Sequence, residues 1–492
     1  MTSSLRIDVA AVTVSLAGKT ALDSVTWSLD GHEHWAFLGA NGAGKSTLLK
    51  LLRGDVRPDQ TSDGNKLGSC IWTIDGEAET SPLAIKPLAR MVSAEQQRLY
   101  MRRGWNITGL GMVLSGLTNS LLPSPADESQ TATAGSLAAE LGAADLMDMN
   151  VNAMSQGQLR LILLARAMVS RPALLLLDEP FDGLDTVTRG VMHAAVDTAS
   201  ESASVIVSAH RADDLPRCLT HALSLENGRV VSCGPLPSVS HEQHIASRPD
   251  APLPKPLPRP VRSGRYALEM DTVDVYVDRA KVLHGISWRL PEGENWRIAG
   301  PNGSGKSTLL RLIAGLEHVA LGGEFFWFGM RHPSLEARLR ETGYLSDRLH
   351  AAYTYDVTGL ELVLSGFDGS VGLWRTFSGK EKDEARHWIN FLGLSAMAAT
   401  PVSRLSSGTA RRFFLARALV GPVRLLLLDE PCSGLDAPSR DLFLAGLDAV
   451  LASGVQCLYV SHHDSDVPHK VTHELVLDAG TIVHAGKLLA KS

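Results

Sequence analysis

The sequence predicts an α/β fold that is built twice within one chain. A glycine-rich segment, GANGAGKSTLL at 39–49, recurs as GPNGSGKSTLL at 300–310, and a leucine run that ends in an acidic pair, LLLLDEP at 174–180, recurs at 425–431. A strand of four leucines is typical of a parallel sheet that is covered on both faces, and each glycine segment stands between an apolar strand and a helix. Repeats about 250 residues apart indicate duplication of a whole domain rather than a solenoid.

A proline-rich segment marks the boundary between the two predicted domains, 1–245 and 265–492. The stretch 246–264 reads ASRPDAPLPKPLPRPVRSG and contains six prolines. Because proline fixes φ and has no amide hydrogen, we expect an extended spacer here, with a ligand for an SH3-type domain as the alternative. The glycine segments are 261 residues apart and the acidic pairs 251, so the first domain carries about ten additional residues, expected around 58–87.

Composition favours a globular protein of the cytoplasm. Of the 492 residues, 44% are hydrophobic and 20% are charged, and the formal net charge of −6 argues against a chain that binds nucleic acid through its overall charge. The five cysteines stand far apart and form no CxxC pair, so neither a zinc site nor a disulfide framework is expected. The N-terminus lacks a signal-peptide core, and no apolar run is long enough to span a bilayer. A role at a membrane would therefore require a separate spanning subunit.

The two glycine segments fit the phosphate-binding pattern GxxxxGK[ST]. Glycines allow consecutive backbone amides to curl around phosphate oxygens, and the helix that follows directs its positive end toward the same anion. Lys45 and Lys306 are expected to reach the β- and γ-phosphates of a nucleoside triphosphate, while Ser46 and Ser307 are expected to bind Mg²⁺. The expected nucleotide-binding residues of the two loops are Gly39, Ala40, Asn41, Gly42, Ala43, Gly44, Lys45, Ser46, Thr47, Gly300, Pro301, Asn302, Gly303, Ser304, Gly305, Lys306, Ser307 and Thr308.

An acidic pair closes each leucine strand. Asp178 and Asp429 are expected to complete the Mg²⁺ sites, since that cation prefers oxygen ligands such as carboxylates. Glu179 and Glu430 follow them directly. A carboxylate in that place can orient and deprotonate the water that attacks the γ-phosphate, so these two residues are the predicted catalytic bases.

A third repeated motif carries a specific resemblance. Ser155-Gln-Gly-Gln and Ser406-Ser-Gly-Thr each begin 23 residues before the strand-end aspartate and precede an LARAM or LARAL helix. They resemble the signature, usually LSGGQ, of ABC-type ATPases, and the tandem layout is most similar to ModF-like double ATPases associated with molybdate transport loci. The resemblance implies a RecA-like α/β core, an antiparallel β subdomain and a helical subdomain in each domain. It also implies ATP and Mg²⁺ as ligands, with Ser155, Gly157, Ser406 and Gly408 completing the γ-phosphate site of the opposite domain.

The same resemblance assigns two further kinds of site residue. His210 and His462 correspond to switch histidines that hydrogen-bond the γ-phosphate, with His463 as the alternative to His462. Gln97 corresponds to a glutamine that contacts Mg²⁺, and a gapless alignment places Asp347 there in the second domain.

The adenine-binding position also differs between the domains. The family stacks an aromatic side chain on adenine upstream of the glycine loop, and Tyr276 stands there in the second domain. The first domain has Ser15 or Leu16 instead. Together with the exchange of glutamine for aspartate, this difference predicts two unequal ATP sites.

Two classes of function fit these features. The first is an ATPase that energises or regulates a membrane transporter, with a transmembrane permease as partner and a location on the inner face of the plasma membrane. The second is a cytosolic ATPase that acts on ribosomes, nucleic acid or another protein. The short proline-rich spacer, the negative charge and the missing cysteine clusters argue against direct nucleic-acid binding. Pairing of the two halves is expected, and a homodimer is the alternative.

Overall fold

The computed structural model describes most of the chain in two compact units, Met1–Gln243 and His244–Ser492, which are treated separately below. The predicted spacer 246–264 lies outside the described residues, so the predicted boundaries stay a prediction. The side chains of Arg348 and Ala351 are likewise not described. The described residues are 4–16, 18–31, 33–60, 67–123, 125–209, 215–236, 265–320, 322–331, 333–353, 356–461 and 463–488.

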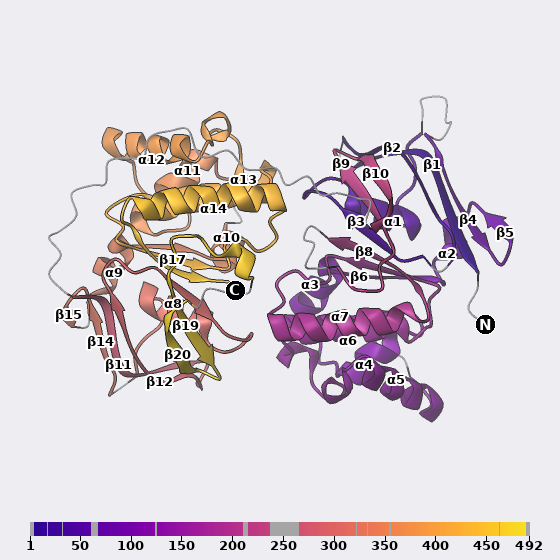
Figure 1. Ribbon diagram of the computed structural model, residues 1–492, viewed down its shortest axis with the longest axis horizontal. Coiled ribbons are helices and arrows are strands. Elements are labelled where there is room, and N and C mark those ends of the chain that lie inside the picture. Colours follow the sequence, from indigo (N-terminus) through magenta and orange to yellow (C-terminus); the bar gives the residue numbers. More distant parts are fainter. Residues whose placement is uncertain are drawn as a thin grey trace. The chain divides into compact units, whose positions relative to one another are not determined.

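The first unit contains two sheets (Figure 1). A four-stranded antiparallel sheet has the order β2 (Lys19–Leu29), β1 (Leu5–Leu16), β4 (Ser69–Ile74), β5 (Glu77–Glu79). The six-stranded core sheet has the order β10 (Arg229–Pro235), β9 (His221–Glu226), β3 (Trp35–Leu38), β8 (Ser204–Ala209), β7 (Leu174–Asp178), β6 (Ala89–Ser93). Its strands are parallel except for the edge strand β10.

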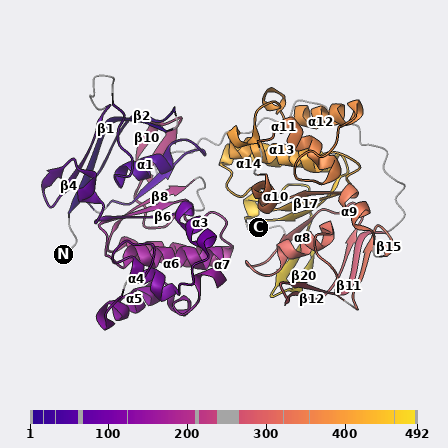
Figure 2. The same cartoon turned by 180° about the vertical axis from the view of Figure 1, so that it is seen from behind.

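Some helices of the first unit cover its core sheet, and others form a separate group beside that sheet. In both views the group α4, α5 and α6 lies away from the antiparallel sheet, with the core strands between them (Figures 1 and 2). The helices are α1 (Lys45–Leu52), α2 (Pro82–Ile85), α3 (Ala94–Arg103), α4 (Gly109–Ser115), α5 (Glu128–Glu140), α6 (Gln156–Met168) and α7 (Thr186–Ser200).

The second unit repeats this architecture. Its antiparallel sheet has the order β12 (Ala280–Pro291), β11 (Tyr266–Val277), β14 (Glu324–Trp327), β15 (Met330–Arg331). Its core sheet has the order β16 (Thr342–Leu345), β17 (Leu425–Asp429), β18 (Gln456–Val460), β13 (Trp296–Ala299), β19 (His473–Asp478), β20 (Thr481–Lys487), with only β20 antiparallel. The helices are α8 (Lys306–Ala314), α9 (Leu335–Glu341), α10 (Asp347–Ala352), α11 (Gly359–Leu364), α12 (Gly379–Phe391), α13 (Ser407–Leu419) and α14 (Ala437–Ala452).

The leucine strands explain where the cores lie. Leu174 and Leu176 of β7 pack in the core under the antiparallel sheet, whereas Leu175 and Leu177 pack in the core shared with α4 and α6. All four are completely buried. Because side chains alternate along a strand, each face of the sheet has its own core. The prediction of a RecA-like core, an antiparallel subdomain and a helical subdomain in each domain is confirmed.

Candidate functional site

Each glycine loop joins a core strand to a helix that no described side chain caps. The loop after β3 leads into α1, whose N-cap is Gly44 with φ of 107°, and no described side chain caps it. The equivalent helix α8 begins after Gly305 in the same way. By contrast, Ser93, Thr108 and other polar residues cap the later helices with their side chains. An uncapped helix start exposes orphan amide donors, which suits a phosphate.

Sterics require glycine at the start of each loop. Gly39 has φ of 143°, and a Cβ there would stand 2.3 Å from the carbonyl oxygen of Leu225. Gly300 has φ of 136°, and a Cβ there would stand 2.0 Å from the carbonyl oxygen of Leu477. Real Cβ atoms do not approach main-chain oxygens so closely, so the backbone of the next core strand fixes both loops from behind.

The two loop lysines fold over their own loops. Lys45 Nζ donates to the carbonyl oxygens of Gly39 at 2.6 Å and Ala40 at 3.1 Å, and it stands 3.7 Å from Glu179 Oε1. Lys306 Nζ makes the equivalent bonds to Gly300 at 2.9 Å and Pro301 at 2.7 Å. Both ammonium groups are therefore held at the rim of the cradle, where an incoming phosphate can replace the carbonyl oxygens.

Two of the three expected metal-binding side chains of the first domain, Ser46 and Asp178, meet. The Ser46 hydroxyl donates to Asp178 Oδ1 at 2.9 Å, and the Ser208 hydroxyl donates to the same oxygen at 2.7 Å. Within the described ranges, no set of three or more histidines, cysteines and acidic residues could hold a metal. This donor set fits Mg²⁺, which proteins bind through one or two carboxylates together with nucleotide phosphates and water.

The second domain differs at this point. Asp429 pairs with Val460 in the strand register in which Asp178 pairs with Ser208, so the second aspartate lacks the serine hydroxyl. Burial raises the pKa of Asp429 to about 6; a hydrogen bond from Ser307 opposes this, and the nearby Glu430 carboxylate adds to it. Burial also raises the pKa of Asp178, but there the Ser208 and Ser46 hydroxyls both work against it. Ser208 was not predicted from the sequence, because only the pairing of β7 with β8 brings it beside Asp178.

The predicted catalytic bases share an unusual backbone. Glu179 and Glu430 have φ of 51° and 48°, in the left-handed region that residues with a Cβ rarely adopt. The amide of Glu179 donates to the Ser208 hydroxyl at 2.9 Å, and the amide of Glu430 donates to the Val460 carbonyl at 3.1 Å. The same backbone geometry recurs in both domains, as it also does at Ala11 and Thr272, so it is a feature of the shared fold.

The signature serines cap their helices. Ser155 forms a capping box at the start of α6, in which its hydroxyl accepts from the amide of Gln158 and its own amide donates to the Gln158 side chain. The Ser406 hydroxyl instead donates to the Thr409 hydroxyl at 2.8 Å and accepts from the Thr409 amide. Both serines are exposed, while Gly157 and Gly408 are buried. Each helix start therefore presents a hydroxyl to solvent at the positive end of its dipole.

Gln97 is turned toward the signature helix. Its Nε2 donates to the Gln156 carbonyl at 3.0 Å, and its Oε1 accepts from the Arg160 guanidinium at 3.0 and 3.1 Å. Both ends of the amide are thus bound to α6, and its role as a magnesium ligand stays a prediction. The contact to Arg160 was not predicted from the sequence.

The alignment of Gln97 with Asp347 does not match the strand register. Ala89 pairs with Leu174 in one core sheet, and Thr342 pairs with Leu425 in the other. Ser93 and Ser346 then cap the next helix in each domain. Counted from these caps, the residue that corresponds to Gln97 is His350. The gapless alignment gives Asp347 because the first domain has additional residues between this cap and the next helix. Asp347 instead stands at the first position of α10.

The adenine-stacking position is exposed in the second domain. Tyr276 is 52% exposed and pairs with Lys281 near the turn of the β11–β12 hairpin. The glycine loop packs on this hairpin, since a Cβ on Gly305 would stand 2.6 Å from the Leu283 side chain. In the first domain Ser15 takes the position of Tyr276 in the register, and its amide donates to Asp59. The predicted switch histidines His210 and His462 lie outside the described residues.

The fold and the two loops define a duplicated P-loop nucleotide-binding protein. The model of the ABC transporter family matches residues 22–182 and 283–433. The chain is 31% identical over 495 residues to the ABC transporter ATP-binding protein ModF of Escherichia coli (strain K12), which covers 95% of this chain and 96% of that protein. It is 38% identical over 205 residues to the zinc transport system ATP-binding protein TroB of Treponema pallidum, covering 42% of this chain and 75% of TroB. The chain belongs to the ABC transporter ATP-binding family and is a tandem ATP hydrolase.

A solved structure shares the tandem fold. It is a complex of archaeal ribosomal stalk protein aP1 with the archaeal ribosome recycling factor aABCE1, at a TM-score of 0.62 and 18% identity, covering 97% of this chain and 90% of that chain. At this identity the likeness concerns the fold alone. Every helix that the structure describes is too short or too polar to cross a bilayer.

Proposed function

We propose that this ATPase energises a membrane transporter from the inner face of the plasma membrane. The family resemblance implies that one ATP would bind in the Lys45 loop and be completed by the Ser406 helix, and that a second would bind in the Lys306 loop and be completed by the Ser155 helix. The observation that carries the ATP-binding part of this proposal is the pair of uncapped glycine-loop helices in a chain that also exposes two serine-capped signature helices. Each feature is half of an anion site, which the other domain would complete.

The residues of each domain divide the work on ATP. Backbone amides of the loop and the lysine bind the β- and γ-phosphates. Ser46 with Asp178, and Ser307 with Asp429, would hold Mg²⁺, which when bound neutralises charge on the phosphates. Glu179 and Glu430 orient water and accept its proton. Tyr276 stacks on adenine in the second domain, and His210 and His462 contact the γ-phosphate.

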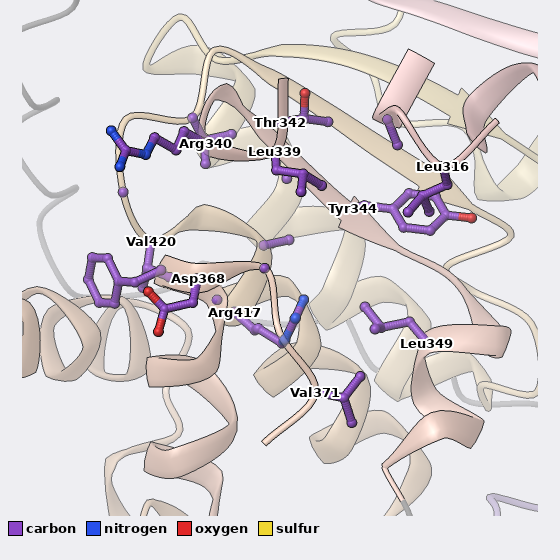
Figure 3. A pocket seen from close by; sticks show the side chains of 18 of the residues that line it. Leu316, Leu339, Arg340, Thr342, Tyr344, Leu349, Asp368, Val371, Arg417 and Val420 are labelled. Atoms are coloured by element: carbon purple, nitrogen blue, oxygen red, sulfur yellow. The ribbon is translucent and has the colours of Figure 1, made fainter. Parts of the chain in front are cut away.

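A cavity in the second domain supports a permease as the partner. It has a volume of about 1390 Å³ and lies between α8, α9, β16, α10 and the segment that follows α11 (Figure 3). Leu316, Leu339, Leu349, Val371 and Val420 supply apolar side chains, with charged Arg340 and Asp368 among them. Leucines and valines next to charged groups suit a short amphipathic segment, so the proposed occupant is a cytoplasmic helix of the permease.

The proposed cargo is molybdate or a related oxyanion. This assignment rests on the similarity to ModF over 95% of the chain and on the tandem layout that the two proteins share. It predicts that the partner permease imports an oxyanion. In a strain that lacks this chain, uptake of labelled molybdate or sulfate should therefore fall, while uptake of a metal cation should not change.

Co-purification tests the proposal. The Glu179→Gln, Glu430→Gln double variant should retain ATP and be recovered with a permease from solubilised membranes, because a slow hydrolysis step prolongs the closed state. Leu335, which lines the cavity and is 51% exposed, supplies a cavity variant, Leu335→Asp, that should lose the permease. Leu83 is 76% exposed in the first domain, so Leu83→Asp serves as a control for a surface charge.

The outcomes separate the two classes of function. Loss of the permease in Leu335→Asp but not in Leu83→Asp supports docking in the cavity. Recovery of ribosomal proteins alone, with no membrane protein, would replace the transporter by a cytosolic ATPase that acts on ribosomes. A Lys45→Ala, Lys306→Ala chain should recover neither partner in an ATP-dependent way.

A further inference from the structure

The arginine five residues after each signature serine ties the helix to the core in a different way in each domain. In the first domain Arg160 donates to Gln97 Oε1 through Nε and Nη2, and its Nη1 donates to the carbonyl oxygens of Pro180 at 2.9 Å and Asp182 at 2.7 Å. Gln97 is 4% exposed and Arg160 6%. This latch is buried, and its hydrogen-bond acceptors are one amide and two main-chain carbonyls, while the nearby Asp182 and Glu179 carboxylates add an electrostatic interaction with Arg160.

In the second domain the corresponding latch contains a carboxylate. Arg411 Nη2 forms a short ion pair with Asp347 Oδ1 and reaches the Ser433 carbonyl only at 3.4 Å. Its Nη1 is buried and finds no hydrogen-bond partner among the described residues. The Asp347 side chain is 61% exposed, whereas that of Arg411 is 6% exposed. The ion pair therefore carries most of this connection, and one of its members stands in water.

The residue in the place of Gln97 does not take over its role. The His350 ring lies 4.7 Å from that of Phe414, and among the described residues Arg411 donates to Asp347 and Ser433 rather than to this ring. Burial and the positive charge of Arg411 lower the pKa of His350, and the Asp347 carboxylate opposes them. Asp347, at the first position of α10, supplies the acceptor instead, while Leu349 of the same helix lines the cavity described above.

We infer that Asp347 and Arg411 are positioning residues that hold the Ser406 helix to the core through a salt-labile latch, which the first domain lacks. Dissolved ions screen an exposed carboxylate, and moving from about 0.1 M to about 1 M salt shortens the Debye length from about 10 Å to about 3 Å. The buried latch of the first domain is screened much less, because its acceptors are uncharged and lie away from water. Exposed ion pairs are worth only modest free energies, so the expected loosening of α13 is about two- to five-fold.

Hydrogen exchange of the nucleotide-free, full-length chain tests the inference. The first hydrogen-bonded amides of the two signature helices, 410–414 and 159–163, are compared at the two salt concentrations. We expect exchange at 410–414 to rise about two- to five-fold with salt, and exchange at 159–163 to stay constant. Asp347→Asn should abolish the salt dependence at 410–414, and Asp347→Glu should restore it. Gln97→Glu should introduce a salt dependence at 159–163.

Two results would overturn the latch: an equal salt response in both helices, or a salt response that persists in Asp347→Asn. The effect of the latch on ATP binding rests on the proposed function, so a second experiment measures it separately. In a Lys306→Ala background only the Lys45 loop can hold ATP, so salt should weaken Mg·ATP binding more in the Asp347 chain than in the Asp347→Asn chain. A salt response in exchange without one in ATP binding would retain the latch and contradict the pairing of Ser406 with the Lys45 loop.

Discussion

The Ser46 hydroxyl donates a hydrogen bond of 2.9 Å to Asp178 Oδ1, although 132 residues separate the two in the sequence. The bond joins the start of α1, which follows the phosphate-binding loop, to the end of β7, which carries the first residue of the acidic pair. The oxygen atoms proposed for Mg²⁺ are thus held together by the fold itself. Preorganisation of this kind lowers the cost of binding, because few side chains must be reordered.

Base stacking should make the second ATP site the tighter one. Tyr276→Ala should weaken ATP binding at the Lys306 loop about 10- to 100-fold, since stacking of a base on an aromatic ring is worth about 1–3 kcal/mol. Ser15→Ala, the matched change in the first domain, should leave binding at the Lys45 loop unchanged. Titration of a fluorescent ATP analogue into Lys45→Ala and Lys306→Ala backgrounds separates the sites. Equal effects of the two changes would contradict the assignment of Tyr276.

The start of the first loop should not tolerate a side chain. Gly39→Ala would place a Cβ 2.3 Å from the Leu225 carbonyl at a positive φ, so it should destabilise the first domain by about 1–3 kcal/mol and displace the loop. Gly190, in α7, has open space around its Cβ position, so Gly190→Ala should stabilise by about 0.5–1 kcal/mol. Differential scanning calorimetry of the full chain measures both changes. A neutral Gly39→Ala would show that the loop is not fixed by β9.

Turnover should depend mainly on the first acidic pair. Asp178 receives hydroxyl hydrogen bonds from Ser46 and Ser208, whereas Asp429 has Val460 in the place of Ser208. A general base contributes about 10²–10⁴-fold at its own site, so Glu179→Gln should remove most of the kcat and Glu430→Gln should leave most of it. Steady-state phosphate release compares the two variants. Equal losses of turnover would remove the idea of unequal sites.

The helical subdomain of the second domain should weaken in acid through Glu381. The Arg375 guanidinium hydrogen-bonds this carboxylate and lowers its pKa to about 2. A lowered pKa contributes stability that is complete above the unfolded pKa of about 4.5 and is lost as pH falls toward 2. Because the pair is solvent-exposed, the difference in unfolding free energy between wild type and Glu381→Gln should be about 1 kcal/mol or less at pH 6, and it should shrink toward zero at pH 2. Urea unfolding across this range measures it; a difference that grows in acid would contradict the sign.

The sequence predicts most of the fold, because the features that specify it are local. Four consecutive leucines followed by an acidic pair define a buried strand, and the glycine pattern defines the turn that follows another strand. The roles of Lys45 and Asp178 follow from these motifs without knowledge of tertiary contacts. The spacing to the glycine loop also predicts that the two ATP sites differ, with Tyr276 in the second domain where the first has Ser15.

Other parts of the site depend on strand register, which cannot be read from the amino-acid sequence alone. The counterpart of Gln97 is one such case: counting from the helix caps Ser93 and Ser346 gives His350, whereas Asp347 is the residue that contacts the equivalent arginine, Arg411. Ser208 and Arg411 act through side-chain contacts that join segments far apart in the chain. No local pattern predicts such contacts, since they arise only when the strands are assembled.

The central claim is that each half of this chain contains a functional phosphate-binding loop. The number of ATP molecules bound per chain tests this claim most directly. Equilibrium dialysis of the Glu179→Gln, Glu430→Gln chain with Mg²⁺ and radiolabelled ATP should give two ATP per chain. Lys45→Ala or Lys306→Ala should reduce this to one, and both together to none. Two ATP retained by the double lysine variant, or none bound by the parent, would contradict the account.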